Sequence, residues 1–116
     1  MVRRELLSME LLERVAPMIR VAAHPLRLRI LDYLDVSNEP RTVSEITNVC
    51  HSPAAFVSQQ LRILKDQGIV TCRRRGNHVY YTIANRAILH LLDCIRHTIG
   101  VRKDEIDRNT EGANQA

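Results

Sequence analysis

The spacing of apolar residues changes from a helical to a strand period at Gly68, and this change limits the possible folds. Before Gly68, apolar side chains recur at steps of three and four residues, which indicates amphipathic helices. After it, Ile69–Arg73 and Val79–Ile83 have the composition of two strands, separated by a turn at Arg75–His78. The sequence therefore predicts a mainly helical chain that carries one β-hairpin.

Start and stop signals define two helices near the N-terminus. Ser8 is a plausible N-cap for a helix over Met9–Ala23, in which Pro17 is expected to produce a kink or to begin a second piece. His24–Pro25 should break the chain, because a residue before proline avoids helical dihedrals. A second helix then runs to the turn-forming segment Ser37–Pro40.

Two further helices are expected before the hairpin. Thr42 and Glu45 have the spacing of a capping box, which starts a short helix that ends near Cys50. Ser52–Pro53 then predicts the N-cap and first residue of a helix over Ser52–Gln67, which stops at Gly68. The apolar side chains of this helix are expected to point inward: Phe56, Val57, Leu61 and Leu64.

A fifth helix follows the hairpin, from Asn85 to about Gly100. Two short helices, a hairpin and apolar helices at both ends are typical of a winged helix-turn-helix that dimerises through its terminal helices. We therefore expect one DNA-binding and dimerisation domain over residues 1–100. Residues 101–116 are polar and without a period, which predicts a flexible tail.

Three stretches resemble the ArsR/SmtB family of repressors: His24–Leu31, Val57–Val70 and Gly76–Ile83. They occur in the same order as in that family, and the resemblance extends over about Val15–Gly100. It implies a dimeric winged-helix repressor that binds double-stranded DNA at a pseudo-palindromic operator. Many members leave DNA when a metal ion binds or when a cysteine pair is oxidised, and some respond to neither.

The helix over Ser52–Gln67 carries small and polar side chains on the side opposite its apolar residues: Ala54, Ala55, Ser58, Gln59 and Arg62. A Gln side chain can bond an adenine edge in two places, Ser can bond several bases, and an Ala methyl can touch a thymine methyl. Base contact is therefore predicted for Ser58 and Gln59, with Arg62 on a base or a phosphate.

The hairpin is basic, with four residues that could contact the DNA backbone or minor groove: Arg73, Arg74, Arg75 and His78. Strand alternation sends Arg73 and Arg75 to one face and Arg74 to the other. The formal net charge of +4 agrees with a polyanionic partner, although many soluble proteins are equally basic.

The metal sites common in the family are absent. Where the short-helix site has two cysteines, this chain has Thr47 and Val49. The positions of the last-helix site hold four other residues that make no such site: Asn85, Ala87, Thr98 and Val101. A different set shares one face of the last helix: His90, Asp93, Cys94 and His97. These could bind Zn²⁺ or another transition-metal ion across a dimer axis, or they could form an ordinary polar face.

The three cysteines are widely spaced, which fits a reducing cytoplasm rather than a disulfide framework. A redox pair of Cys50 and Cys94 is a rival to metal sensing, although Cys94 does not match the family's usual last-helix position. Cys72 is expected to be a packing residue.

Other function classes are less consistent with the sequence. It contains no Gly-rich phosphate loop or nucleophile motif, so an enzyme is not expected. No apolar run is long enough to span a bilayer, and no secretory signal is recognisable at the N-terminus. Two alternatives stay open, namely a winged-helix module for protein contacts and a constitutive repressor without an effector.

Overall fold

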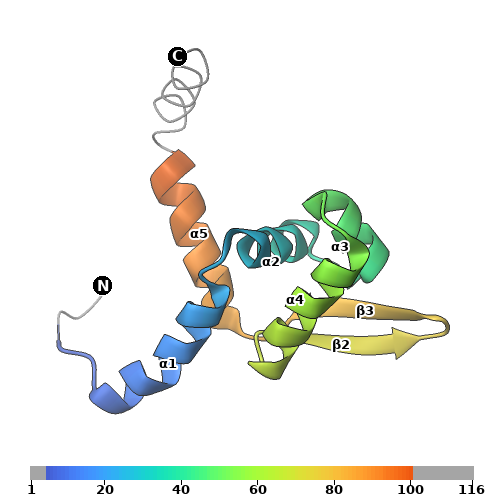
Figure 1. The fold of residues 1–116 in the computed structure, drawn as a ribbon. Coiled ribbons are helices and arrows are strands. Elements are labelled where there is room, and N and C mark those ends of the chain that lie inside the picture. Colours follow the sequence, from blue (N-terminus) through green and yellow to red (C-terminus); the bar gives the residue numbers. More distant parts are fainter. Residues whose placement is uncertain (1–4, 101–116) are drawn as a thin grey trace. The chain divides into compact units, whose positions relative to one another are not determined.

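The computed structural model describes residues 5–100 (Figure 1). The chain forms two compact units, one that ends at Asn85 and one that begins at Arg86. The predicted tail over residues 101–116 lies outside the described residues. No helix in the described part combines the length and the apolar character needed to cross a membrane.

The predicted order of four helices, a hairpin and a fifth helix is confirmed. The elements are α1 (Met9–Ala22), α2 (Pro25–Ser37), β1 (Arg41–Thr42), α3 (Val43–Cys50), α4 (Ala54–Asp66), β2 (Val70–Arg75), β3 (His78–Ile83) and α5 (Arg86–Gly100). The first seven belong to the first unit, and α5 belongs to the second.

Side-chain caps start the first two helices. The Ser8 hydroxyl accepts a hydrogen bond from the Leu11 N–H at 3.2 Å, as predicted for an N-cap. Helix α1 continues through Pro17, so this proline opens no second piece. His24 breaks the chain as expected, and it also caps α2, because its Nδ1 accepts from the Leu26 N–H at 3.2 Å.

The capping box of α3 is confirmed, but the predicted start of α4 is wrong by one residue. Pro53 is the N-cap of α4, without a side-chain cap, and the Ser52 hydroxyl instead donates to the Cys50 carbonyl at 3.3 Å. Pro53 is extended (φ −57°, ψ 140°), and its carbonyl accepts from the N–H groups of both Phe56 and Val57 at 3.0 Å. The Pro53 carbonyl thus satisfies N–H groups in the first turn of α4, whereas Ser52 lies one residue too early in the chain for its hydroxyl to cap them.

Gly68 ends α4 in a Schellman motif, as its position in the sequence indicates. The Ile69 N–H donates to the Leu64 carbonyl at 3.0 Å, and the Gly68 N–H donates to the Lys65 carbonyl at 2.9 Å. Gly68 has φ +70°, a conformation that a residue with a Cβ adopts only at a cost. Ile69 and Leu64 are both fully buried, which supplies the apolar contact that accompanies this motif.

The sheet has three antiparallel strands in the order β1-β3-β2, whereas the sequence predicted only the hairpin. Strand β1 adds two residues to β3, with Arg41 opposite Tyr81 and Thr42 opposite Tyr80. The hairpin turn consists of Gly76 and Asn77. The predicted turn over Arg75–His78 is therefore too long by one residue at each end, because Arg75 and His78 belong to the strands. Gly76 has φ +62°, which suits the first loop residue of a two-residue hairpin.

The core of the first unit is aliphatic. Its buried members come from α1, α2, α3, α4 and the start of the hairpin: Ala22, Ile30, Leu31, Leu34, Ile46, Val57, Leu61, Leu64, Ile69 and Val70. Phe56 is an exception to the predicted inward face, since it is 42% exposed. It precedes the stripe of Val57, Leu61 and Leu64 by one residue, which turns it about 100° away around the helix.

Candidate nucleic-acid interface

Helices α3 and α4 form the helix-turn-helix pair. They are joined by His51–Pro53, and His51 takes the left-handed conformation with φ +51°, which lets the chain reverse within a short link. Ile46 of α3 and Val57 of α4 are both fully buried. The apolar sides of the two helices are therefore inside, and the opposite side of α4 is exposed.

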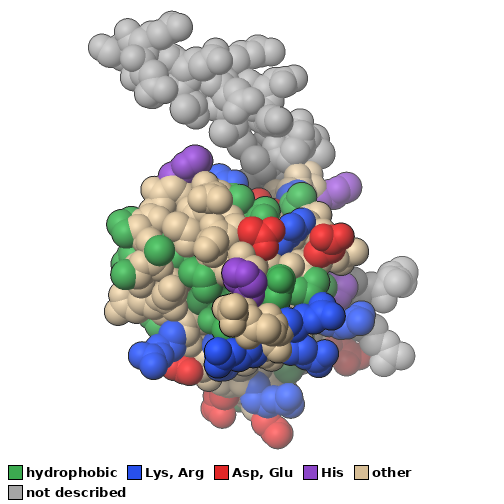
Figure 2. Space-filling model, turned by 90° about the vertical axis from the view of Figure 1, so that its right-hand side faces the viewer, with side chains coloured by type: hydrophobic (Ala, Val, Ile, Leu, Met, Phe, Trp, Pro, Cys, Tyr) green, Lys and Arg blue, Asp and Glu red, His purple; other side chains and the backbone are tan. Residues whose placement is uncertain are grey.

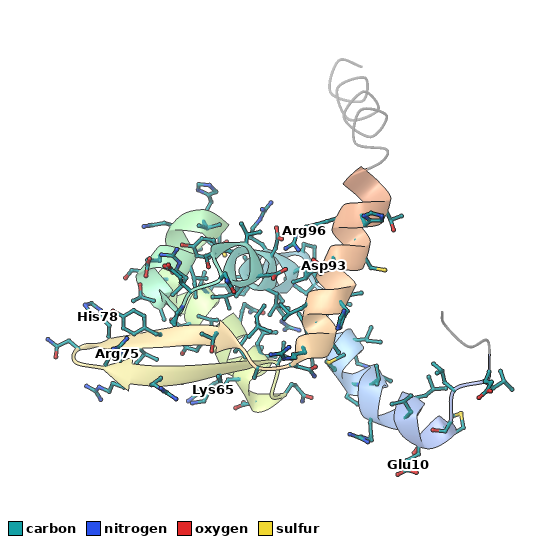
Figure 3. The ribbon with its side chains drawn as sticks, turned by 180° about the vertical axis from the view of Figure 1, so that it is seen from behind. Glu10, Lys65, Arg75, His78, Asp93 and Arg96 are labelled. Atoms are coloured by element: carbon teal, nitrogen blue, oxygen red, sulfur yellow. The ribbon has the colours of Figure 1, made fainter. Side chains whose placement is uncertain are left out.

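The outer face of α4 is exposed at every predicted position: Ala54, Ala55, Ser58, Gln59 and Arg62. Lys65 is exposed too, and Figure 3 shows it on α4. Lys65 is not among the residues predicted from the sequence, although it follows Ser58 by seven residues and so lies on the same side of the helix. These residues are exposed. Their contact with DNA stays a prediction.

The wing, which we define as β2, β3 and their turn, exposes all four predicted basic residues: Arg73, Arg74, Arg75 and His78. Arg75 and His78 lie opposite each other beside the tip, as Figure 3 shows. In Figure 2, which looks toward this tip, Lys and Arg side chains form a band across the lower part of the surface. The wing therefore adds positive charge on a projecting element.

The predicted alternation of the wing arginines is confirmed. Arg73 and Arg75 both line a groove of about 420 Å³ on one face of the wing, and Arg74 is absent from its lining. The Arg74 Nε donates instead to the Gly76 carbonyl at 3.4 Å. The full lining is Pro40, Thr71, Cys72, Arg73, Arg75, Tyr80 and Thr82. One wing face thus carries two guanidinium groups beside hydroxyl groups, a combination that suits phosphate oxygens.

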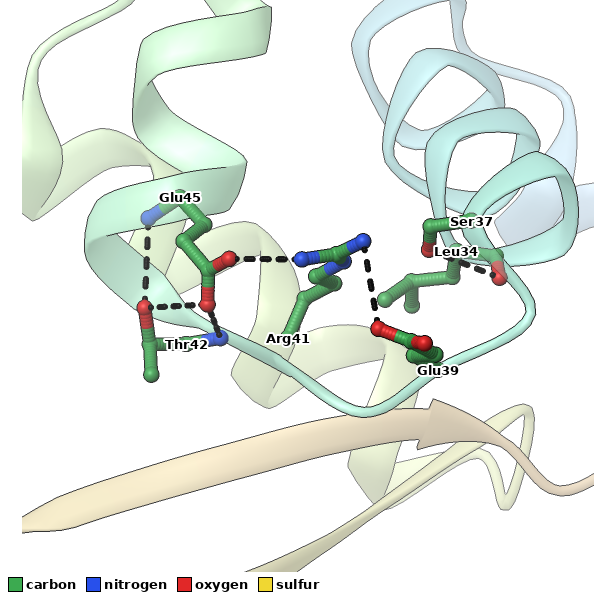
Figure 4. Close-up of polar contacts among 6 residues, drawn as sticks. All are labelled: Leu34, Ser37, Glu39, Arg41, Thr42 and Glu45. Atoms are coloured by element: carbon green, nitrogen blue, oxygen red, sulfur yellow. Dashed lines mark hydrogen bonds and ion pairs between the residues drawn. The ribbon is translucent and has the colours of Figure 1, made fainter.

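A polar cluster connects β1 to α3 (Figure 4). The Arg41 guanidinium bonds to the Glu45 carboxylate at 2.8 Å, lies 3.6 Å from the Glu39 carboxylate, and stacks over the Tyr33 ring at 5.7 Å. Glu45 also accepts from the Thr42 N–H at 3.1 Å. The first helix of the pair is thereby joined to the sheet that carries the wing.

The carboxylate of Glu45 should make stability depend on pH. The Thr42 N–H, and after it the Arg41 guanidinium, lower the pKa of Glu45 below its ordinary value. The folded state therefore favours the ionised form, and this stabilisation is complete above the ordinary glutamate pKa of about 4.3. It disappears as the pH falls through the lower pKa of the folded protein.

We expect Glu45→Gln to weaken this acid-side dependence while it keeps the cap, because Gln can also accept from the Thr42 N–H. Thermal unfolding temperatures between about pH 7 and pH 3 provide the measurement. Glu39→Gln is the control, since Glu39 takes no part in the capping box. Identical pH profiles for the wild-type chain and Glu45→Gln would contradict this role.

The metal-ligand candidates of α5 form no site within one chain. In the described residues, no three His, Cys, Asp or Glu side chains are grouped so that they could hold a metal ion. Asp93 instead accepts from Arg96 at 3.0 Å on the same helix (Figure 3). At the family's short-helix position, the Thr47 hydroxyl donates to the Val43 carbonyl at 2.7 Å and offers no thiolate. A site shared by His90, Asp93, Cys94 and His97 of two chains stays a prediction.

The three cysteines are free thiols. Cys50 is half-buried at the end of α3, and burial raises the pKa of its thiol, with Arg29 opposing this rise. The thiolate that oxidation requires is therefore disfavoured at Cys50. A redox role for Cys50 and Cys94 stays a prediction without support from this geometry. Cys72 is half-buried within β2, opposite Tyr81.

Known proteins resemble this chain in both sequence and fold. A helix-turn-helix domain family matches residues 22–73, from the end of α1 into β2. The transcriptional repressor SmtB of Mycobacterium tuberculosis is 36% identical over 89 residues, and the match covers 76% of this chain and 64% of the repressor. This chain therefore spans slightly less than two thirds of that relative's length.

A second relative is matched over more of its length. The SmtB homolog of Synechocystis sp. is 31% identical over 90 residues, which cover 78% of this chain and 67% of the homolog. The solution structure of Mb0332 from Mycobacterium bovis is a homodimeric winged helix-turn-helix DNA-binding domain of a possible ArsR-family regulator. It superposes with a TM-score of 0.70 at 28% identity and covers 90% of this chain and 95% of that one. The present chain therefore belongs to the ArsR/SmtB family of winged helix-turn-helix regulators.

Proposed function

We propose that this chain is a sequence-specific transcriptional repressor that binds double-stranded DNA as a homodimer. The observation that carries the proposal is the outer face of α4, whose small and polar side chains are all exposed next to a basic wing. Such a helix fits the major groove, and the hairpin that follows it can lie along the adjacent backbone. We propose no catalytic activity for this chain. Its proposed location is the cytoplasm, where it would bind DNA.

Sequence specificity would come from the first turns of α4. Ser58 and Gln59 are exposed there and can bond base edges, whereas Ala54 and Ala55 offer methyl groups to thymine. Arg62 lies one turn further along and can bond a guanine edge or a phosphate. The two SmtB relatives are called transcriptional repressors, which agrees with a DNA-binding role for this chain.

Affinity would come mainly from the wing. Arg73 and Arg75 present their side chains on one face of the hairpin, beside Tyr80 and Thr82. Charge-assisted bonds from guanidinium groups to phosphates release counterions, so binding should weaken steeply as salt rises. Arg74 and His78 are also exposed on the wing and are proposed as additional backbone contacts.

The homodimer would form through the terminal helices. The first unit exposes a series of large apolar side chains on and before α1: Leu6, Leu7, Met9, Leu11, Leu12 and Ile19. Such a concentration is typical of a surface that a protein partner covers. A second copy supplies that partner and presents two α4 helices to half-sites about 34 Å apart.

Selection of duplexes from a random pool tests the proposal. The bound fraction should converge on an imperfect inverted repeat, and mobility shifts should show two chains on each duplex. Arg73→Ala and Arg75→Ala should each reduce the salt dependence of binding by about one ion, because each removes one phosphate contact. A pool that does not converge, together with binding insensitive to salt, would favour the protein-contact module instead.

A further inference from the structure

Gln60 is the one polar residue that is buried within the described part of the chain. The residue is only 4% exposed, and it lies in α4 among the apolar residues that hold this helix in the core. A buried amide destabilises a protein unless a partner satisfies it. That partner is Arg27 of α2, whose Nε donates to the Gln60 Oε1 at 2.8 Å.

The same guanidinium also contacts the end of α1. The Arg27 Nη1 donates to the Val21 carbonyl at 3.0 Å. Val21 lies in the last turn of α1, where carbonyl groups lack partners within the helix. A positive charge at this end is also favoured by the helix dipole. One side chain of α2 therefore joins the C-terminus of α1 to the buried side of α4.

This arrangement requires arginine. The two acceptors, the Gln60 Oε1 and the Val21 carbonyl, belong to different helices. They accept hydrogen bonds from the Arg27 Nε and Nη1, which are held in one rigid plane. A lysine would keep the charge but supply a single flexible nitrogen, which cannot hold both acceptors in fixed positions. The link Val21–Arg27–Gln60 therefore fixes the position of α4 against α1, and it also satisfies the buried amide of Gln60.

We propose that Arg27 is a positioning residue that sets the orientation of α4 relative to α1, and hence the half-site spacing that the dimer prefers. The inference rests on the proposed function, in which α1 contacts the second copy and α4 contacts DNA. The Val21–Arg27–Gln60 link then connects the dimer interface to the DNA-binding helix. Loss of the link loosens this geometry without removing any side chain of the outer face.

The experiment compares operator spacing in four proteins. The inverted repeat selected by the wild-type chain is prepared with its native spacer and with a spacer one base pair longer or shorter. Affinities are measured for the wild-type chain, Arg27→Lys, Gln60→Leu and the control Arg29→Lys. Arg29 lies in the same helix and pairs with Asp32 within that helix, so its exchange for lysine leaves charge and the link unchanged.

We expect the wild-type chain to bind the operator with the native spacer at least about tenfold more tightly than the operators with altered spacers. In both link variants this affinity ratio should fall about fivefold. Arg29→Lys should retain the wild-type ratio. Gln60→Leu replaces the amide by an apolar side chain of similar size, so it carries the test if Arg27→Lys folds poorly. If the link variants keep the wild-type affinity ratio between spacers, the positioning role is overturned. Lowered unfolding temperatures in the same variants would then indicate that Arg27 only stabilises the fold. A wild-type chain that binds no duplex would instead contradict the proposed function itself.

Discussion

Alanine in place of Leu61 is expected to lower the free energy of unfolding by about 3 kcal/mol, within the usual range for a buried leucine. Leu61 is fully buried, as are Val57 before it and Leu64 after it on the same side of α4. The substitution removes apolar contacts and leaves a cavity in a small aliphatic core, which has few large side chains to fill it. Urea unfolding at one fixed protein concentration provides the measurement, because dimerisation would otherwise shift the result.

Phe56→Ala is the matched comparison for Leu61→Ala in the same helix. Phe56 is the larger residue, but it is 42% exposed and lies outside the apolar stripe. We expect it to cost about 1 kcal/mol, well below the roughly 3–5 kcal/mol of a buried phenylalanine. Equal losses for the two variants would contradict the exposed position of Phe56 and the inward direction of the α4 stripe.

Replacing Gln59 by alanine is expected to weaken binding to the selected operator by about 1–3 kcal/mol and to relax the preference at one base pair. Gln59 is exposed near the start of α4, where helices of this type contact base edges. Its amide can donate to and accept from an adenine edge at once, which an alanine methyl cannot do. Affinities for the operator and for its single-base variants provide the measurement.

Gln67→Ala is the control for Gln59→Ala. Gln67 is also an exposed glutamine, but it is the C-cap residue at the other end of α4. We expect it to leave both affinity and base preference unchanged. Equal weakening of all duplexes by Gln59→Ala would indicate a phosphate contact rather than a base contact, and no weakening would remove Gln59 from the interface.

Local signals made much of this fold predictable. Ser8, the capping box of Thr42 and Glu45, and Gly68 each act through bonds to residues nearby in the chain, so their sequence spacing contains the needed information. The same holds for the alternation of Arg73, Arg74 and Arg75, which follows from strand geometry. The outer face of α4 was predictable because a regular helix separates an apolar side from a polar one.

Features that depend on distant residues were not predictable in this way. Strand β1 has two residues and exists because β3 offers a free edge, so no period marks it. The burial of Gln60 depends on Arg27, which lies 33 residues earlier in the chain. The apolar character of Phe56 predicts an inward position, but this residue lies one position outside the buried stripe and is exposed.

Amide chemical shifts of the labelled chain, followed during titration with the selected duplex, test the central claim most directly. We predict the largest changes in the first turns of α4, at Ala54, Ser58 and Gln59, and in the wing at Arg73 and Arg75. The exposed end of α2 near Val36 should change little, because it is not part of the proposed interface. Large changes confined to α2, with α4 and the wing unaffected, would contradict the assignment of α4 as the DNA-binding helix.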